Sequence, residues 1–366
     1  MLNTTLFKQI FFQKILRITT LRFLVNLKLK LRNSVNSRIH IPVLLSEMLT
    51  ALAPISGKCY LDGTFGSGGY TRAILEKADC TVLAIDRDPE SIARAQIMKK
   101  EFNDRKRKHL IPLQGRFSQM YTLAKTAGYS TVDGVTLDLG FSSAQMDNPK
   151  RGFSFRFDGP LDMRMESSGM TAADLVNTAS KKELSDIIFY LGEERYACRI
   201  AKAIVEARKI VPINRTSDLA ALVRRSLPYS NYKSIDPATR TFQALRIYVN
   251  NELEELEHGL DAAEQLLAPG GKLAVVSFHS LEDRKVKLLL RKRSGHDPNP
   301  SRYDLEAIAG KCTGFSPTFV NTLFPLILPQ KDEIAQNPRA RSARLRIGYR
   351  TEALAWRLQE KSNKIV

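Results

Sequence analysis

A glycine-rich turn and a later carboxylate are the residues of this chain that could most readily do chemistry. Residues 59–69 read Cys-Tyr-Leu-Asp-Gly-Thr-Phe-Gly-Ser-Gly-Gly, and Asp86 follows Asp62 by 24 residues. Glycines allow a backbone to approach a ligand without a Cβ clash, and a carboxylate at the end of the next strand can accept hydrogen bonds from ribose hydroxyls. The pattern predicts a nucleoside-cofactor site formed by Asp62, Gly66, Gly68, Gly69 and Asp86.

The spacing of this turn indicates which cofactor it suits. The dinucleotide fingerprint is G-x-G-x-x-G, whereas this chain has Gly66-Ser-Gly68-Gly69-Tyr70. An anion at Asp62 would repel a pyrophosphate but attract a sulfonium and an α-amino group. The residues therefore favour S-adenosylmethionine over NAD, and a strand-to-helix turn with no ligand remains an alternative.

Two polar residues at strand ends are candidate catalytic groups. Asp138 ends a predicted strand over residues 132–137, and His279 directly follows another over 272–278. A carboxylate that accepts an N–H hydrogen bond from an exocyclic amine directs the nitrogen lone pair towards a methyl donor. Asp138 is the first candidate for this role, although it could instead hold the methionine amine of the cofactor or cap a helix. His279 could orient a base or donate to its ring carbonyl, and a purely structural role is the alternative.

Aromatic and basic residues later in the chain suggest contact with RNA. Phe153, Phe155 and Phe157 alternate with polar and basic residues after Arg151. Such rings can stack on a splayed base while arginine holds phosphate, but a half-buried edge strand gives the same alternation. A C-terminal stretch containing Arg339 and Arg341 carries five arginines without an acid, which suits phosphate contact. Arg151, Phe153, Phe155, Arg339 and Arg341 are thus predicted RNA contacts.

The composition limits the class of protein. The 366 residues carry a net charge of +18 and are 43% hydrophobic, so an anionic partner is expected. No apolar run approaches the ~20 residues of a membrane helix, and no membrane association is predicted. The four cysteines lack metal-ligand spacing, and we predict no metal site.

The N-terminal segment has the composition of a targeting sequence. Residues 1–38 contain eight basic residues and no acid. Basic residues that alternate with Leu, Ile and Phe are typical of a mitochondrial transit peptide. We expect residues 1–38 to be a disordered transit peptide to the mitochondrial matrix; the alternative is a basic RNA-binding arm.

Strand and helix patterns alternate after this segment. Strands are predicted over residues 59–61, 81–85, 110–113, 132–137 and 272–278, with helices over 70–77, 89–100, 118–126, 251–267 and 280–293. Alternation of this kind predicts an α/β fold with a parallel sheet, and an antiparallel pair over 323–328 and 344–349 is expected to close it.

A long insertion separates the fourth and fifth strands. A crossover needs little more than a dozen residues, so about 100 must be inserted. Helices are predicted there over 171–178, 181–191, 193–209 and 217–226, with Ser217 and Asp218 as an N-cap pair. The expected organisation is a core of residues 39–145 and 247–366 with an inserted helical substrate-recognition domain, 146–246.

Several motifs in order resemble one family. They are Asp62-Gly-Thr-Phe-Gly-Ser-Gly-Gly, Ala84-Ile-Asp-Arg-Asp-Pro, Leu137-Asp-Leu-Gly-Phe-Ser-Ser, Arg151-Gly-Phe-Ser-Phe, Gly159-Pro-Leu-Asp-Met-Arg-Met, Gly192-Glu-Glu-Arg, Pro237-Ala-Thr-Arg-Thr-Phe-Gln-Ala, Ser277-Phe-His-Ser-Leu-Glu-Asp-Arg and Asn337-Pro-Arg-Ala-Arg-Ser. Over about residues 40–350 the chain resembles the RsmH (MraW) family of S-adenosylmethionine-dependent rRNA cytosine-N4 methyltransferases. With its transit-like start it resembles the mitochondrial branch.

The resemblance implies a fold, a substrate and further site residues. It implies a class I, Rossmann-like methyltransferase sheet and mitochondrial small-subunit (12S) rRNA, free or in an assembling subunit, as substrate. Cofactor contacts are implied at Gly68, Gly69, Tyr70, Asp86, Phe117, Asp138 and Gln145. Tyr70 replaces the usual His, and Ala144 stands where many members have Pro.

A second class of function is open at this point. The chain could be an RNA-binding ribosome-assembly factor whose methylation activity is secondary. The three aspartates Asp62, Asp86 and Asp138 favour the enzyme, because a pure RNA-binding protein has no need of a sulfonium site. The oligomeric state is left open, with a homodimer as one alternative.

Overall fold

The computed structural model describes residues 42–103, 108–228, 236–295, 315–320 and 326–363. The transit peptide predicted for residues 1–38 lies outside these ranges, so that prediction stays untested. In the part of the chain that is described, no helix is both long and apolar enough to cross a membrane.

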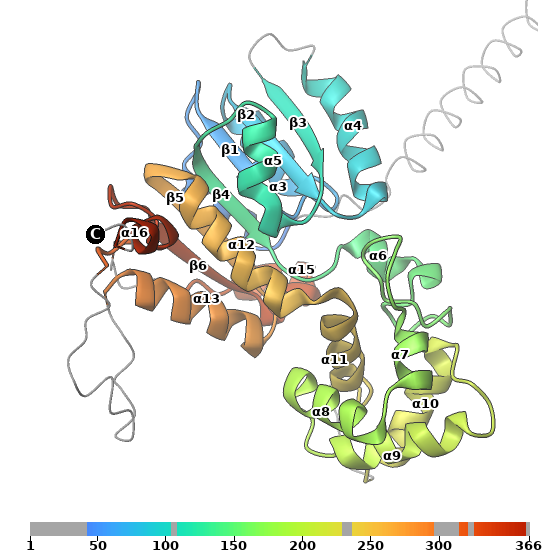
Figure 1. Cartoon of the computed structure of the whole chain (residues 1–366). Helices are drawn as coiled ribbons and strands as arrows, with labels where there is room; N and C mark the ends of the chain where they lie inside the picture. The colour runs from blue at the N-terminus through green and yellow to red at the C-terminus, as the bar shows by residue number, and fades with distance from the viewer. Residues whose placement is uncertain (1–41, 104–107, 229–235, 296–314, 321–325, 364–366) are drawn as a thin grey trace, which may run out of the picture. The chain divides into compact units, whose positions relative to one another are not determined.

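A single six-stranded sheet forms the core of the described residues (Figure 1). Its strands are β1 (Cys59–Asp62), β2 (Thr81–Asp86), β3 (His109–Gln114), β4 (Val132–Asp138), β5 (Leu267–Ser277) and β6 (Arg344–Tyr349). The order is β3-β2-β1-β4-β5-β6. The first five strands are parallel, and β6 pairs antiparallel with β5. The doubly wound α/β fold predicted from the sequence is confirmed.

Successive residues of the strands enter two different hydrophobic cores, because side chains alternate between the faces of a sheet. Tyr60 and Val82 pack with helices on one face, whereas their neighbours Leu61 and Leu83 pack on the other. Burial on both faces explains why the strands read as continuous apolar runs.

Three helices pack on the first face and three on the second. The first face carries α2 (Leu45–Leu52), α3 (Gly69–Lys77) and α4 (Pro89–Asn103). The second carries α5 (Met120–Thr126), α12 (Glu252–Leu266) and α13 (Ser280–Arg293). A short 3₁₀ turn, η1 (Phe117–Gln119), leads into α5.

The inserted segment is helical, as predicted, and has its own hydrophobic core. Its helices are α7 (Ala172–Thr178), α8 (Lys181–Gly192), α9 (Ala197–Arg208), α10 (Thr216–Ser226) and α11 (Thr239–Asn250). They gather apart from the sheet in Figure 1. Before them come α6 (Ser143–Asp147) and the 3₁₀ turn η2 (Pro149–Arg151). The predicted domain boundary at 246/247 falls inside α11, and the division into domains stays a prediction.

Two helix starts in the insertion differ from the prediction. Helix α9 begins at Ala197 rather than at residue 193, because Glu193 adopts a left-handed φ of 50° and ends α8. Helix α10 begins at Thr216, and its N-cap residue Arg215 makes no side-chain cap bond. The N-cap prediction for Ser217 and Asp218 was therefore wrong; instead the Ser217 amide donates to Asp158 Oδ1 at 3.4 Å.

The last strands of the sheet also differ from the prediction. β5 starts at Leu267 rather than at residue 272 and runs through Pro269-Gly-Gly, with a register irregularity opposite residues 132–134. Of the predicted strand 323–328, residues 323–325 lie outside the described ranges, and Ile327 makes one isolated bridge to Leu345. Helix α15 (Lys331–Gln336), the 3₁₀ turn η3 (Pro338–Ser342) and helix α16 (Trp356–Asn363) complete the chain.

Candidate functional site

The glycine turn after β1 is held by two aspartates. Asp62 is fully buried, and its carboxylate accepts hydrogen bonds from Thr71 Oγ1 at 2.7 Å and from the Thr64 amide at 3.2 Å. Asp86, at the end of the neighbouring strand β2, accepts from the Gly66 amide at 2.7 Å. The two carboxylates therefore shape the loop from both ends, at the carboxyl edge of the sheet where open α/β proteins bind ligands.

Positive φ angles and close neighbouring atoms both require glycine in this loop. Gly66 has a φ of 54° and Gly68 a φ of 80°, values that favour glycine. A Cβ on Gly68 would lie 2.5 Å from Met98 Cε and 2.6 Å from Phe65 Cζ, and one on Gly69 would lie 2.2 Å from Pro42 Cγ. The loop is thus a tight strand-to-helix turn at the carboxyl edge of the sheet.

Asp138 carries the clearest sign of an incomplete site. Its backbone amide donates to Thr64 Oγ1 at 2.6 Å, but its buried Oδ1 atom has no hydrogen-bond partner among the described residues. Burial, and then the charges of Asp62 and Glu282, raise the pKa of Asp138 well above its usual range. An isolated buried carboxylate oxygen is costly, so this atom fits a cationic or N–H ligand.

The acids of this edge fit the cofactor predicted from the sequence. Burial raises the pKa of Asp62 to about 6, against the hydrogen bond from Thr71. Burial also raises the pKa of Asp86. Three carboxylates destabilised by burial suit a sulfonium, an amino group and ribose hydroxyls. S-adenosylmethionine carries all three of these groups.

The loop acids extend to a buried network that joins the core to the insertion. Asp88, two residues after Asp86, is almost fully buried. Its Oδ2 accepts from Gln145 Nε2 at 2.8 Å and from Arg151 Nη1 at 2.9 Å. Gln145 Oε1 in turn accepts the Ser142 amide at 2.9 Å.

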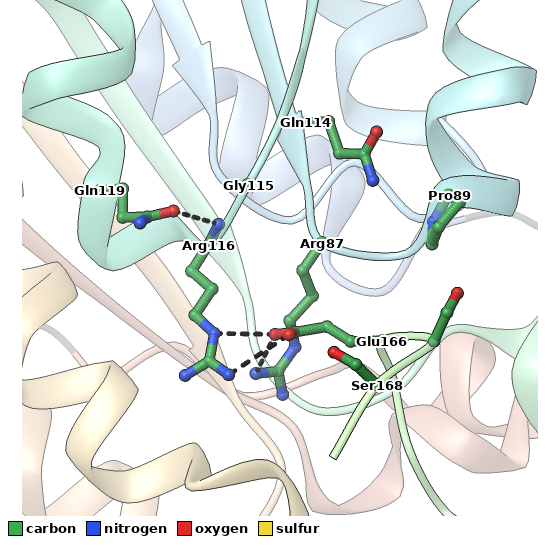
Figure 2. Close-up of a pocket in the computed structure, with 9 residues that line it drawn as sticks. Arg87, Pro89, Gln114, Gly115, Arg116, Gln119, Glu166 and Ser168 are labelled. Carbon is green, nitrogen blue, oxygen red and sulfur yellow. Dashed lines mark hydrogen bonds and ion pairs between the residues drawn. The ribbon is translucent and has the colours of Figure 1, made fainter.

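A cavity of about 360 Å³ with mostly polar lining residues lies at the carboxyl ends of β2 and β3 (Figure 2). Across it, Arg116 Nε donates to Glu166 Oε1 at 2.7 Å, and Arg87 Nη1 lies 3.5 Å from the same oxygen. The lining residues are Arg87, Pro89, Gln114, Gly115, Arg116, Gln119, Glu166, Ser167 and Ser168. Arg87, which lines the cavity, directly follows Asp86, the acid predicted to bind ribose.

His279 lies at the carboxyl end of β5, as predicted, and caps α13. Its Nδ1 accepts from the Glu282 amide at 3.5 Å. Its Nε2 lies 3.1 Å from Glu282 Oε1, but the contact is not aligned as a hydrogen bond, so Nε2 has no hydrogen-bond partner among the described residues. Although burial opposes it, the imidazole and Arg246 hold the pKa of Glu282 low.

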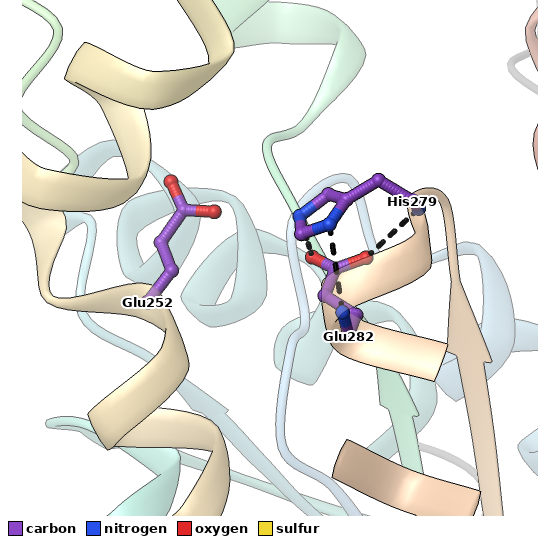
Figure 3. A group of neighbouring side chains, drawn as sticks. All are labelled: Glu252, His279 and Glu282. Atoms are coloured by element: carbon purple, nitrogen blue, oxygen red, sulfur yellow. Dashed lines mark hydrogen bonds and ion pairs between the residues drawn. The ribbon is translucent and has the colours of Figure 1, made fainter. Parts of the chain in front are cut away.

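Glu252 joins His279 and Glu282 in one cluster (Figure 3), whose donor atoms lie within 4.8 Å of one another. Such a set can hold a divalent cation. Here, however, Arg246 pairs with both oxygens of Glu252, each at 2.8 Å. An arginine already supplies the positive charge, so the cluster gives no reason to revise the prediction of no metal site.

Aromatic rings connect this cluster to Arg151. Arg246 lies 4.8 Å from the centroid of Phe141, and Phe141 stacks on Phe153 with centroids 5.4 Å apart. Arg151 lies 5.9 Å from the centroid of Phe153 on its other side. Both faces of Phe141, in the loop after Asp138, are thereby covered.

Three cofactor contacts implied by the family resemblance have defined surroundings. Phe117 is half-buried, and its ring packs where a Cβ on Gly259 would lie 2.3 Å away. The Tyr70 hydroxyl donates to the Val43 carbonyl in the core, so only its backbone is free to serve a ligand. The Gln145 side chain is used by Asp88 and Ser142.

The predicted RNA contacts are placed in two kinds of surroundings. Phe153 is buried, Arg151 is paired with Asp88, and Phe155 packs edge-on against Phe242 with centroids 4.9 Å apart. This loop forms no strand, which excludes the edge-strand alternative. Arg339 and Arg341 are exposed, and Arg339 pairs with Asp147 at 2.7 Å. RNA contact by all five residues stays a prediction.

The other arginines of the C-terminal stretch are structural. Arg346 is buried and donates to Asp283 Oδ1 at 2.6 Å, with Arg344 at 2.9 Å from Oδ2. Arg350 is buried and donates to the Glu264 carbonyl at 3.0 Å.

Sequence reasoning missed Asp88, Glu166 and Arg246. The sequence contains a signal for Asp88, because this acid follows Asp86, the acid predicted to bind ribose, by two residues and directly precedes α4. The other two residues are recognised only through their partners. Glu166 pairs with residues 50 or more positions away in the chain, and Arg246 pairs with Glu252 across the junction of α11 and α12.

Comparison with known proteins identifies close relatives. The model of the MraW methylase family matches residues 37–351. A "Ribosomal RNA small subunit methyltransferase H" of Paramagnetospirillum magneticum is 54% identical over 317 residues, covering 87% of this chain and 97% of its own. A protein of the same name from Rhodospirillum centenum is 54% identical over 320 residues, covering 87% and 94%.

Solved structures show a weaker likeness. A putative methyltransferase from Streptococcus mutans in complex with SAH is 10% identical, covers 85% of this chain and 99% of its own, and has a TM-score of 0.35. This likeness is too low to add to the sequence relationship.

Proposed function

Because the chain belongs to the MraW methylase family and is an S-adenosylmethionine-dependent methyltransferase, we propose that it methylates N4 of a cytidine in mitochondrial small-subunit (12S) rRNA. Its partner is this rRNA, free or within an assembling small subunit, and its location is the mitochondrial matrix. The relatives named ribosomal RNA small subunit methyltransferase H support the rRNA substrate.

The unpartnered Oδ1 of Asp138 is the observation that carries the proposed reaction. It is an acceptor at the end of β4, next to the glycine loop through the bond from its amide to Thr64. An exocyclic amine that donates an N–H to this oxygen has its lone pair turned away from Asp138. Orientation of this weakly nucleophilic amine is a large part of what a methyltransferase must supply. No strong base is needed, because the methylated amine can lose its proton after the transfer.

The remaining residues hold the cofactor and the base. S-adenosylmethionine supplies the methyl group when it is bound. Asp86 would accept from the ribose hydroxyls, Asp62 would face the positive charge, and the glycine loop would follow the ligand backbone. His279 Nε2, which lies 3.1 Å from Glu282 Oε1 but has no hydrogen-bond partner among the described residues, would contact the ring of the base.

The N-terminal segment supports the mitochondrial location. The family match begins at residue 37, so the acid-free basic segment of residues 1–36 is not required by the methyltransferase itself. A fluorescent protein carrying residues 1–38 tests this, since it should enter mitochondria, and replacement of the basic residues by Ser should keep it in the cytosol.

The central experiment is nucleoside mass spectrometry of mitochondrial small-subunit rRNA from cells with and without the protein. We expect N4-methylcytidine to disappear on depletion and to return with the intact chain but not with Asp138→Ala. An unchanged signal on depletion would contradict the rRNA assignment. If Asp138→Ala restored subunit assembly without the modified nucleoside, the assembly role would be primary.

A further inference from the structure

We propose that an exposed surface at the junction of α8 and α13 binds a single-stranded segment of the substrate RNA next to the methylated nucleotide. This α8–α13 surface consists of Phe189 and Tyr190 on α8, Arg240 at the start of α11 and Arg284 on α13. The proposal rests on the rRNA methyltransferase function and adds a second RNA contact outside the catalytic edge.

Two aromatic side chains project from the end of α8 into solvent. Phe189 is 51% exposed and Tyr190 is 67% exposed, and their rings meet edge to face with centroids 5.1 Å apart. Helix α8 buries its opposite face through Leu184, Ile187 and Ile188, so folding of the insertion does not require these two rings. Exposed ring faces of this kind serve as stacking platforms for unpaired bases.

Two arginines contact Glu193 and Glu194, the two residues that directly follow α8. Arg240 is 55% exposed and lies 3.9 Å from Glu194; Arg284 is 60% exposed and lies 3.5 Å from Glu193. Arg284 and Glu193 are both exposed, so their contact contributes little to stability, whereas Glu194, the partner of Arg240, is buried. Arg240 contacts Glu194 and the Glu193 carbonyl through Nη1. The Arg284 guanidinium and the Nε and Nη2 groups of Arg240 can therefore donate to phosphate oxygens.

Glu193 connects this surface to the catalytic edge. Its carboxylate accepts from Ser280 Oγ at 2.5 Å, and its carbonyl accepts from Arg240 Nη1 at 3.2 Å. Phe189 precedes Glu193 by one helical turn, and Ser280 directly follows His279. A strand whose cytosine lies at Asp138 and His279 would therefore continue over Arg284 towards the two rings.

The charge of the protein favours nucleic acid over a second protein as the occupant. The whole chain carries a net charge of +18, and both arginines of this surface contact Glu193, four residues after Phe189. Aromatic rings flanked by arginine match single-stranded RNA, in which bases and phosphates alternate.

The test compares variants of the full-length protein for RNA affinity and methyl transfer, with a small-subunit rRNA transcript as probe. Phe189→Ala with Tyr190→Ala should weaken RNA binding by about 10-fold per ring removed while leaving S-adenosylmethionine affinity unchanged. Phe189→Tyr with Tyr190→Phe should keep near-normal affinity, because the ring faces remain. Arg240→Ala with Arg284→Ala should reduce the slope of log K against log salt by about 0.7 per cation.

Val211→Ala and Arg225→Ala are matched controls, because both residues are exposed on other parts of the insertion, and neither should change RNA affinity. If the wild-type protein methylates the transcript but the double alanine variant binds it normally, the α8–α13 surface is not an RNA site while the proposed function stands. If the wild type neither binds nor methylates the transcript, the result contradicts the proposed rRNA methyltransferase function, and the RNA site on the α8–α13 surface is overturned with it. Loss of a dimer in light scattering, with unchanged RNA affinity, would assign the surface to self-association and overturn the proposal.

Discussion

The carboxylate of Asp88 lies 2.9 Å from the guanidinium of Arg151, which is 63 residues further along the chain. Asp88 follows Asp86, the acid predicted to bind ribose, by two residues, whereas Arg151 lies at the end of η2, ahead of the helices of the insertion. Arg151 also donates to the Arg164 and Met165 carbonyls at 3.0 and 3.2 Å. One side chain thereby ties the turn after β2 to two stretches of the chain that precede α7, the first helix of the insertion's own core.

Arg151→Ala should therefore act on stability rather than on RNA alone. It would leave the carboxylate of Asp88, with a side chain 2% exposed, without its charge partner. Loss of one member of a buried pair costs roughly 3–5 kcal/mol, to be measured as the free energy of unfolding in urea. S-adenosylmethionine affinity should fall as well, because Asp88 and Asp86 share a turn. Asp88→Asn in the Arg151→Ala background should restore part of the stability, and normal stability with reduced RNA affinity would instead support the RNA contact predicted for Arg151.

The comparison of Asp62 with Arg151 illustrates what sequence could predict. Strand β1, the glycines and the next strand form a local unit, so spacing alone predicts that Asp62, Gly68 and Asp86 meet at one edge of the sheet. Arg151 and Phe153 stand in a loop with no regular period, and their partners Asp88 and Phe141 are fixed only when the insertion folds back on the core. Their pattern of rings and cations is the same whether it faces RNA or other side chains, which is why sequence could not decide between these roles.

Asp62 should make cofactor binding dependent on pH. Burial raises its pKa from 3.8 to about 6, so between these values the folded state keeps a proton that the unfolded state releases. The contribution of Asp62 to the free energy of unfolding thus falls as the pH rises from about 4 to about 6 and is constant above. A cationic ligand needs the ionised form. We therefore expect S-adenosylmethionine affinity to fall up to about tenfold per pH unit below pH 6.

Calorimetric titration between pH 5 and 8 measures this profile. Asp62→Asn should bind weakly and lose the change in affinity near pH 6, while the raised pKa values of Asp86 and Asp138 remain. Thr71→Val, which removes the 2.7 Å hydrogen bond to the carboxylate, should move the midpoint to higher pH. A wild-type profile that is flat across pH 6 would show that Asp62 does not face the charge of the cofactor.

Gly259 on α12 gives a test of Phe117 that leaves the ring itself in place. A Cβ at residue 259 would lie 2.3 Å from Phe117 Cδ2 and Cε2, so Gly259→Ala must displace the ring. Alanine favours the helix by about 1 kcal/mol over glycine, and the fold should survive. If Phe117 packs against the adenine, S-adenosylmethionine affinity should drop on the order of 10-fold, since an aromatic contact is worth about 1 kcal/mol or more. His258→Ala, at the exposed neighbouring position, is the control, and equal affinity of both variants would exclude Phe117 from the cofactor site.

Arg341 and Arg346 form a matched pair that separates RNA contact from structure. Both belong to the arginine-rich stretch that suggested RNA binding. Arg346 is buried on β6 and donates to Asp283 at 2.6 and 3.1 Å, and this pairing holds the pKa of Asp283 low even though burial opposes it. Arg341 is exposed and makes no ion pair with another described residue.

Arg346→Met should thus reduce the free energy of unfolding by several kcal/mol, because it leaves Asp283 on α13 with Arg344 alone. Arg341→Ala should leave stability within about 0.5 kcal/mol while it lowers the salt dependence of RNA binding. Denaturant unfolding and RNA titration at two or more salt concentrations measure both effects. The two roles differ in which quantity changes. If Arg346 instead contacted phosphate, Arg346→Met would lower RNA affinity and leave the free energy of unfolding unchanged. Such a result would mean that Arg346 contacts RNA and that its pairing with Asp283 does not stabilise the fold.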